Sequence, residues 1–469
     1  MRGAKVNRID ETHETEKYGV VVMKITLENS MARFKEKFKT SKEFTEKSRE
    51  TIPGGYSRVS FNYGPHAIFV DRGEGQYIYT IDGHRLLDLN NNFTVNVIGH
   101  NHPKITGALT EAIQDGFSFG NPMKYEHQLA EMICDRVESV EKIKFSCSAS
   151  ESCISAVRIA RANTGKNKIA KFEGGYHGFI DDLQISAHPA PDRFPGPADY
   201  PAPLADSAGI PSYTVENTII LPQNDPTGCE KILRENARDI ACVIMELQSG
   251  AGGVIVLDKD FVHGIQAITE ELGILMIIDE TITLRADYNG MQAVYGLKPD
   301  LTVMGKIIGG GLPLGAVGGR AELFHVTENG QVHLSGTHQG HPLAAVAGMA
   351  CLEVMDKAAH DRLNELAEQI KKELNEWSDQ KNFPFIIYGA FSFLGIAFTD
   401  KPGRELKSHR DFWNFSNDDH ALTFALEMAN RDFFPVHRGQ ISLSLPMTDE
   451  DIDGFINTTK EIVTGIFED

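Results

Sequence analysis

The 469-residue sequence predicts an α/β protein: a mostly parallel sheet with helices on both faces, plus a smaller α+β domain. Short strand candidates such as "IACVIM" and "ILMII" are apolar throughout, which is typical of strands that helices cover on both faces. These strands alternate with helical segments from about residue 100, as in a doubly wound domain. After about residue 345 the chain becomes helix-rich, with short strand candidates near "FLGIAF" and "QISLSL".

The elements before and after this region give the expected domain organisation. A charged amphipathic helix is expected over 31–52, and "PGG" stops it. Strand-like pieces follow at 66–73, 76–83 and 84–90, with "DGH" as a hairpin turn. The sequence therefore predicts a flexible N-terminal extension (1–30), an N-terminal segment contributing to the small domain (31–95), a large domain (96–345) and a C-terminal small domain (346–469).

Composition excludes several classes of function. The charge sum is 46 minus 65, or −19, and so acidic a protein repels phosphate backbones, which makes nucleic acid an unfavourable partner. No apolar run approaches the roughly 20 residues of a membrane span, so no membrane partner is expected. Six cysteines occur without CxxC spacing, which gives no support to a metal site and favours a reducing compartment. We expect a cytoplasmic protein without a metal.

Polar side chains follow four of the apolar strands. Tyr176 and His177 follow "KIAKF", Glu246 follows "ACVIM", Asp279 ends "ILMII", and Lys306 follows "DLTVMG". Ligands of parallel α/β sheets bind at the carboxyl ends of the strands, so these groups are expected to converge on one crevice. A lysine in an apolar run is costly unless something neutralises it, which makes Lys306 a candidate functional group.

A phosphate site has one candidate in "SCSASESCISAVRIAR" (146–161), where small hydroxyl residues open an amphipathic helix. Free N–H groups at a helix N-terminus attract anions, although a simple serine N-cap explains the same pattern. A Walker loop is excluded because Ile307 follows Lys306 where serine or threonine is required. "GGGLPLG" lacks the spacing of a dinucleotide fingerprint.

Three segments carry a family resemblance. They are "KFEGGYHG", "IIDETITLRADYNGMQAVYGLKPDLTVMGKIIGGGLPLGAVGGR" and "SGTHQGHPLAAVAG", and their order and spacing resemble the fold-type I, class III pyridoxal-phosphate-dependent aminotransferases. The chain most resembles the glutamate-1-semialdehyde aminomutase-like branch, over nearly its whole length from about residue 32. Within that branch, "PGGYSRVSF" and the short loop between Asp279 and Arg285 resemble the β-amino-acid transaminases.

The resemblance implies catalytic roles for two residues. Lys306 would form the Schiff base with pyridoxal 5'-phosphate and then shuttle the substrate proton. Asp279 would pair with the pyridine nitrogen and keep the ring protonated. Tyr176 would stack on the ring face, and His177 would sit behind it as a supporting group, with a satisfied core histidine as the alternative. Glu246 is a supporting residue, followed here by leucine where relatives carry proline.

The resemblance also implies binding residues. Ser148, Ala149 and Ser150 would hold the cofactor phosphate, with Ala149 and Ser150 standing where relatives carry Gly-Thr. Thr337 matches a residue that reaches the phosphate of a partner subunit, so a homodimer with a shared active site is expected. Arg58 and Arg438 are candidates for binding a substrate carboxylate, with a surface ion pair as the alternative for each.

These features predict a ping-pong aminotransferase that uses a small-molecule amino donor, with a β-amino acid as one candidate, and a keto-acid acceptor. The alternative enzyme is an aminomutase of the glutamate-1-semialdehyde type, which needs no acceptor. A non-catalytic binding protein with the cofactor fold is a third reading, against which the retention of Lys306 and Asp279 argues. His341 stands where relatives usually carry asparagine, and nothing in the sequence explains that change.

Overall fold

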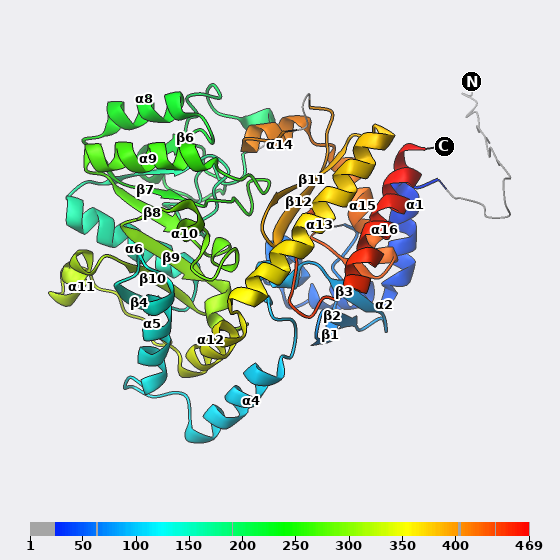
Figure 1. The fold of residues 1–469 in the computed structure, drawn as a ribbon, viewed down its shortest axis with the longest axis horizontal. Coiled ribbons are helices and arrows are strands. Elements are labelled where there is room, and N and C mark those ends of the chain that lie inside the picture. The colour runs from blue at the N-terminus through cyan, green and yellow to red at the C-terminus, as the bar shows by residue number, and fades with distance from the viewer. Residues whose placement is uncertain (1–23, 62–63, 190, 402–404, 437, 469) are drawn as a thin grey trace, which may run out of the picture.

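A computed structural model describes residues 24–61, 64–189, 191–401, 405–436 and 438–468 (Figure 1). Most of the predicted N-terminal extension, residues 1–23, lies outside the described residues. Within them, no helix combines the length and apolar character needed to cross a membrane.

A seven-stranded sheet forms the centre of the larger part of the molecule (Figure 1). Its strands, in spatial order, are β4 (Lys142–Ser146), β10 (Gly315–Gly319), β9 (Leu301–Gly305), β8 (Leu275–Asp279), β7 (Ile240–Met245), β5 (Lys168–Phe172) and β6 (Thr218–Leu221). β9, β8, β7, β5 and β6 pair in parallel, and β10 runs antiparallel to both of its neighbours. The predicted mostly parallel sheet is confirmed.

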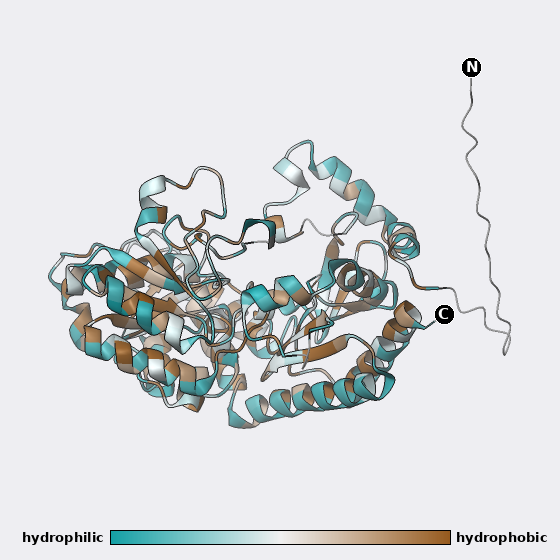
Figure 2. Ribbon diagram, turned by 90° about the horizontal axis from the view of Figure 1, so that it is seen from above, coloured by the Kyte–Doolittle hydropathy of each residue, from teal (hydrophilic) through white to brown (hydrophobic). Residues whose placement is uncertain are grey.

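Helices cover both faces of this sheet, as predicted. One apolar cluster joins α6 to one face, and two other clusters join α8, α9, α10, α5 and α12 to the opposite face. The bounds are α5 (Lys124–Arg136), α6 (Ala149–Thr164), α8 (Pro226–Asn236), α9 (Lys259–Leu272), α10 (Met291–Tyr295) and α12 (Pro342–Val354). Figure 2 shows hydrophobic strands in the interior, between helices that mix hydrophobic and hydrophilic residues. Shorter or peripheral helices are α4 (Pro103–Ala112), α7 (Ser212–Glu216) and α11 (His325–Glu328).

The two ends of the described chain meet in the smaller part of the molecule. A four-stranded sheet has the order β1 (Val70–Glu74), β2 (Tyr77–Thr80), β3 (Arg85–Asp88) and β13 (Phe433–Phe434), so an N-terminal strand pairs with a C-terminal one. A second sheet contains β11 (Phe385–Ala390), β12 (Phe393–Phe398) and β14 (Gln440–Ser442). The helices here are α1 (Leu27–Lys37), α2 (Lys39–Ser48), α13 (Lys357–Lys381), α14 (His409–Phe415), α15 (Asp418–Asn430) and α16 (Asp449–Phe467). The predicted boundaries at 95 and 345 stay a prediction.

The N-terminal helix differs from its prediction over 31–52. It begins at Leu27, where the Thr26 side chain accepts a hydrogen bond from the Asn29 N–H, and it breaks at Phe38 into α1 and α2. Phe38 is fully buried in an apolar cluster with Phe34 and Leu86. This packing fixes a backbone conformation that a helix interior does not have, with φ −111° and ψ 44°.

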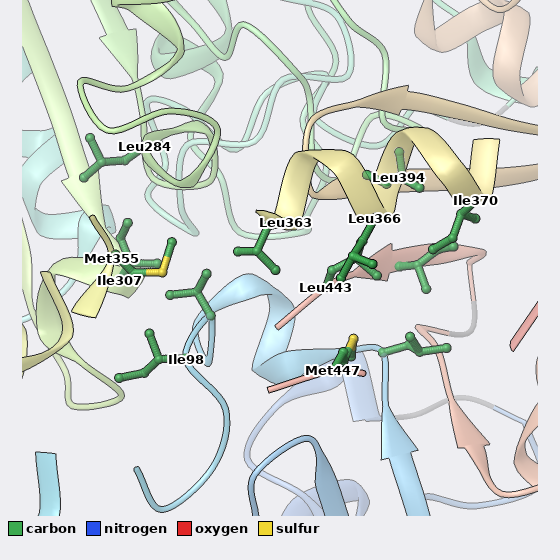
Figure 3. Packing of buried hydrophobic residues seen from close by; sticks show 14 of the residues in the cluster. Ile98, Leu284, Ile307, Met355, Leu363, Leu366, Ile370, Leu394, Leu443 and Met447 are labelled. Atoms are coloured by element: carbon green, nitrogen blue, oxygen red, sulfur yellow. The ribbon is translucent and has the colours of Figure 1, made fainter. Parts of the chain in front are cut away.

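One apolar cluster connects the two parts of the molecule. Figure 3 shows Ile307, next to Lys306, packed with Leu284 and Met355, and the cluster continuing to Leu363 of α13 and to Leu443. All five side chains are almost fully buried. A continuous core of this kind ties the end of β9 to the smaller part, so the candidate site rests on packed elements.

Candidate active site

The turn between β4 and α6 is built as an anion site. Ser148 caps α6, and its Oγ accepts a hydrogen bond from the Glu151 N–H at 3.4 Å. The first N–H groups of a helix have no acceptor within the helix, and the helix dipole adds a partial positive charge there. The 16-residue α6 therefore offers donors at Ala149 and Ser150 that suit a phosphate group.

Three glycines close around this turn. A Cβ added at Gly178 would lie 2.3 Å from Ser150 Oγ, and one added at Gly315 would lie 2.3 Å from the Ser148 carbonyl carbon. A Cβ at Gly305 would lie 3.0 Å from that of Ala149. Only backbone can approach the turn this closely, and Gly178 also has φ +94°. The result is a cradle of backbone around 148–150, which the sequence reasoning did not identify.

Asp279, at the end of β8, is a buried carboxylate with several donors. Its Oδ2 accepts from His177 Nδ1 at 2.9 Å and lies 3.8 Å from Cys153 Sγ, and its Oδ1 accepts from the Thr281 N–H at 3.0 Å. Burial raises the pKa of Asp279, but the His177 and Thr281 hydrogen bonds outweigh it and hold that pKa below its usual value. The carboxylate is therefore kept ionised, as a partner of a protonated ring nitrogen must be.

His177 is almost fully buried, and its Nε2 has no hydrogen-bond partner among the described residues. Since Nδ1 faces the Asp279 carboxylate, Nδ1 carries the proton in the neutral ring. The imidazole supports the carboxylate from the side and fixes its orientation.

Glu246, at the end of β7, fixes the neighbouring loop. Its two carboxylate oxygens accept hydrogen bonds from the Tyr176 N–H at 2.9 Å and from the Gly250 N–H at 3.1 Å. Burial raises the pKa of Glu246, and the Asp279 charge adds to this. The contact places the Tyr176 ring at the site, where 38% of the residue is exposed and therefore open to stacking by a planar ligand.

Lys306 follows β9 in a left-handed backbone conformation, with φ 52°. Such a conformation is unfavourable for a residue with a Cβ and is often retained at functional sites. Burial lowers the pKa of Lys306 to about 8, although Glu246 and Asp279 partly oppose this effect. About a tenth of its amine is thus neutral and nucleophilic at pH 7, far more than for an ordinary lysine.

Arg58 lies near this group, on the segment that follows η1 (Pro53–Gly55). Its guanidinium donates to Asn92 Oδ1 at 2.7 Å, and its Cζ lies over the rings of Phe61 and Phe93, 4.8 Å from each centroid. Its positive charge acts on the pKa values of both Tyr176 and Lys306. The structure therefore brings Arg58 within electrostatic range of Tyr176 and Lys306.

Arg438 is exposed and lies in the smaller part of the molecule. Local desolvation lowers its pKa, and Asp418 opposes that change. Burial, followed by the Arg438 charge, lowers the pKa of His188 to about 4, and the His188 ring lies 5.7 Å from that of Tyr176. Arg438 thus acts electrostatically on His188, which packs beside the Tyr176 ring.

Thr337 is exposed on the segment before α12 and makes no hydrogen bond to the 148–150 turn in the part of the chain that the structure describes. Arg285, by contrast, is fully buried and donates to Ser392 Oγ at 3.0 Å, to the Thr94 carbonyl at 3.2 Å and to the Leu443 carbonyl. It is a structural residue.

The sequence reasoning also missed two sets of contacts. Asn92 and Phe93 hold Arg58, and the run of three asparagines at 90–92 was a usable signal, because asparagine tolerates the left-handed region. Glu173, just before the Tyr176 loop, accepts a bidentate pair from Arg410 at 2.7 and 2.9 Å. These two residues are 237 positions apart, so no local pattern links them.

The family model described as "Aminotransferase class-III" matches residues 59–422. The chain belongs to the class III aminotransferase family. Pyridoxal 5'-phosphate is therefore its cofactor, and the predicted fold type I is confirmed. The backbone cradle at 148–150, the ionised Asp279 and the partly neutral Lys306 fit its phosphate, its ring nitrogen and its aldehyde.

A glutamate-1-semialdehyde 2,1-aminomutase of Bacillus licheniformis is 35% identical over 436 residues, covering 91% of this class III chain and 97% of the relative. An ω-transaminase structure from Sphaerobacter thermophilus is 31% identical, with a TM-score of 0.85, and covers 91% and 97% of the two chains. A β-phenylalanine aminotransferase structure from Variovorax paradoxus is 28% identical, also with a TM-score of 0.85. The match covers 94% of this chain and 97% of that one.

Proposed function

We propose that the protein is an aminotransferase that moves an amino group from an amino acid, with a β-amino acid as the favoured donor, to a keto acid. The observation that carries the proposal is Arg58, a guanidinium without a carboxylate partner among the described residues, whose charge reaches Lys306. A guanidinium binds a carboxylate through two parallel hydrogen bonds. The similarity to a β-phenylalanine aminotransferase supports this choice of donor.

Bound pyridoxal phosphate supplies an aldehyde for the substrate amine and a ring that accepts electrons. The N–H groups of Ala149 and Ser150 would hold its phosphate, and the ionised carboxylate of Asp279 would pair with its ring nitrogen. Tyr176 would stack on one face of the ring. The neutral amine of Lys306 would take the proton from the substrate carbon that bears the amino group and deliver it to the aldehyde carbon of the cofactor, and the second half of the exchange would run the same transfer in reverse.

The dimeric assembly is part of the same proposal. Thr337 matches the residue that reaches a partner's phosphate in this family, yet it is exposed and makes no hydrogen bond to its own 148–150 turn within the described residues. A second copy that brings Thr337 to that turn explains both facts. The active unit is then a homodimer whose two sites are each completed by the other subunit. A cytoplasmic location, which the sparse cysteines favour, stays a prediction.

The alternative is an aminomutase, and the 35% identity to a glutamate-1-semialdehyde 2,1-aminomutase favours it. The decisive experiment measures turnover of a single amino substrate by the cofactor-loaded enzyme with and without a keto-acid acceptor. A transferase completes one half-reaction without acceptor and then stops. Sustained isomerisation of glutamate 1-semialdehyde without acceptor would establish the mutase instead. Absence of both reactions with an intact Lys306–cofactor bond would support the non-catalytic reading.

A further inference from the structure

A run of four residues beside the site has an unusual backbone. Asn91, Asn92, Phe93 and Thr94 have φ values of 50°, 49°, 53° and 76°, and none is glycine. L-residues avoid consecutive left-handed positions because Cβ crowds the following carbonyl oxygen, and β-branched Thr94 is an especially poor residue for one. We call this segment the left-handed turn. Such a turn persists only where its surroundings hold it.

Buried hydrogen bonds hold both ends of the left-handed turn. At its start, Asp88 Oδ1 accepts from the N–H groups of Asn90 and Asn91, both at 2.9 Å, and Asn91 Nδ2 donates to the Ser442 carbonyl at 2.6 Å. At its end, the Thr94 carbonyl accepts from Arg285 at 3.2 Å. Asn91 and Thr94 are buried, whereas Asn92 between them is exposed.

The middle of the left-handed turn faces Arg58. Asn92 Oδ1 accepts from Arg58 Nη1 at 2.7 Å, and the Phe93 ring lies under the guanidinium, which also lies over Phe61. The acceptor on Arg58 is a neutral amide, and no carboxylate pairs with Arg58 among the described residues. The contact therefore positions the guanidinium without neutralising its charge, and its other N–H groups stay available for a ligand.

We propose that the left-handed turn is a positioning device for Arg58, and that Asn92 and Phe93 determine the preference of the enzyme for substrates that carry a carboxylate. This inference rests on the proposed function, since it assigns the control of the same carboxylate site. A rigid turn is suited to the role, because a guanidinium fixed before binding loses less conformational entropy when a carboxylate arrives. Neither Asn92 nor Phe93 takes part in the proton transfer.

The test compares two substrates that differ only in the carboxylate, 3-amino-3-phenylpropionate and 1-phenylethylamine. Asn92→Gly removes the amide oxygen but keeps the positive φ accessible, so KM for the acid should rise about 3- to 10-fold, as expected for one lost hydrogen bond. KM for the amine and kcat for both should not change. Asn92→Asp should raise KM for the acid further, because its carboxylate competes for Arg58. Asn101→Gly is the control, as Asn101 is also an exposed asparagine with φ 50°.

A binding measurement checks the inference without turnover. The dissociation constant of 3-phenylpropionate, measured by calorimetry, should rise for Asn92→Gly by the same factor as KM for the acid. Equal effects on acid and amine, or no effect of either Asn92 variant, would overturn the inference. If Arg58→Ala also leaves 3-phenylpropionate binding unchanged, the carboxylate site of the proposed function fails as well. If Arg58→Ala weakens binding and the Asn92 variants do not, only the positioning role fails.

Discussion

The pair of Glu173 and Arg410 allows a quantitative test of how the Tyr176 loop is held. Glu173 directly follows β5, and Arg410 lies in α14, with side chains only 5% and 12% exposed. Arg410 also donates to the carbonyls of Gly196 at 3.0 Å and Pro195 at 3.2 Å. Replacing Arg410 by glutamine leaves the Glu173 carboxylate buried without its partner.

Loss of one partner of a buried ion pair typically costs about 3–5 kcal/mol. We expect about 3 kcal/mol for Arg410→Gln, because the ammonium of Lys171 remains close enough to interact with Glu173. The loop that Glu173 anchors should then open more often by a factor of roughly 100. Hydrogen exchange followed by mass spectrometry on peptides covering 173–188 measures this directly, since the Gly174 N–H is bonded to the Ser186 carbonyl at 2.8 Å.

Arg234 and Glu271 provide the matched control. They form a bidentate pair with the same distances, 2.7 and 2.9 Å, but their side chains are 43% and 58% exposed. Arg234→Gln should leave exchange of its own segment almost unchanged, because solvent screens an exposed pair. The argument from burial is refuted if both substitutions accelerate local exchange equally, or if 173–188 exchanges at the wild-type rate in Arg410→Gln.

Three further predictions concern the cofactor and the substrate. The pKa of Lys306 is lowered to about 8, so the fraction of neutral amine levels off above that pH. The rate at which the apoenzyme binds pyridoxal phosphate, followed by absorbance, should therefore rise about fivefold from pH 7 to 8 and less than twofold from pH 8 to 9. A tenfold rise per pH unit throughout would indicate an ordinary lysine. Thr337→Ala should increase the dissociation constant of the cofactor about tenfold or more while sedimentation still shows a dimer, and an active wild-type monomer would contradict the shared site. Arg58→Ala should raise KM for a carboxylate substrate by roughly 10- to 100-fold and spare simple amines, whereas Arg72→Ala, at an exposed arginine paired with Glu74, should change neither.

The sequence predicted the large sheet well, because short apolar strands between helices leave few alternatives. It also predicted that Glu246, Asp279 and Lys306 approach one another, since all follow strands that end at the same sheet edge. The break at Phe38 could not be predicted, as it depends on packing against Leu86, far along the chain. Tertiary packing of this kind overrides local helix propensity.

The supports of the site were harder to predict than its reactive groups. Lys306 and Asp279 stand out because a charged residue in an apolar run is unusual. The left-handed turn has no periodicity, so only its asparagines indicated it. The Glu173–Arg410 pair joins residues 237 positions apart, and one sequence without relatives contains no signal for such a contact. The roles assigned to Thr337 and Arg438 stay predictions.

The bonds of Arg285 have a consequence for biosynthesis. Its guanidinium donates hydrogen bonds to the carbonyls of Thr94 and Leu443. In the same way, the N-terminal strand β3 pairs with β13, which lies more than 300 residues later in the chain. A nascent chain therefore leaves Arg285 without its Leu443 acceptor and β3 with an unpaired edge until the segment from β13 to Leu443 has left the ribosome. Because chains in that state are prone to aggregation, truncation before Phe433, which removes both β13 and Leu443, should sharply lower the soluble yield.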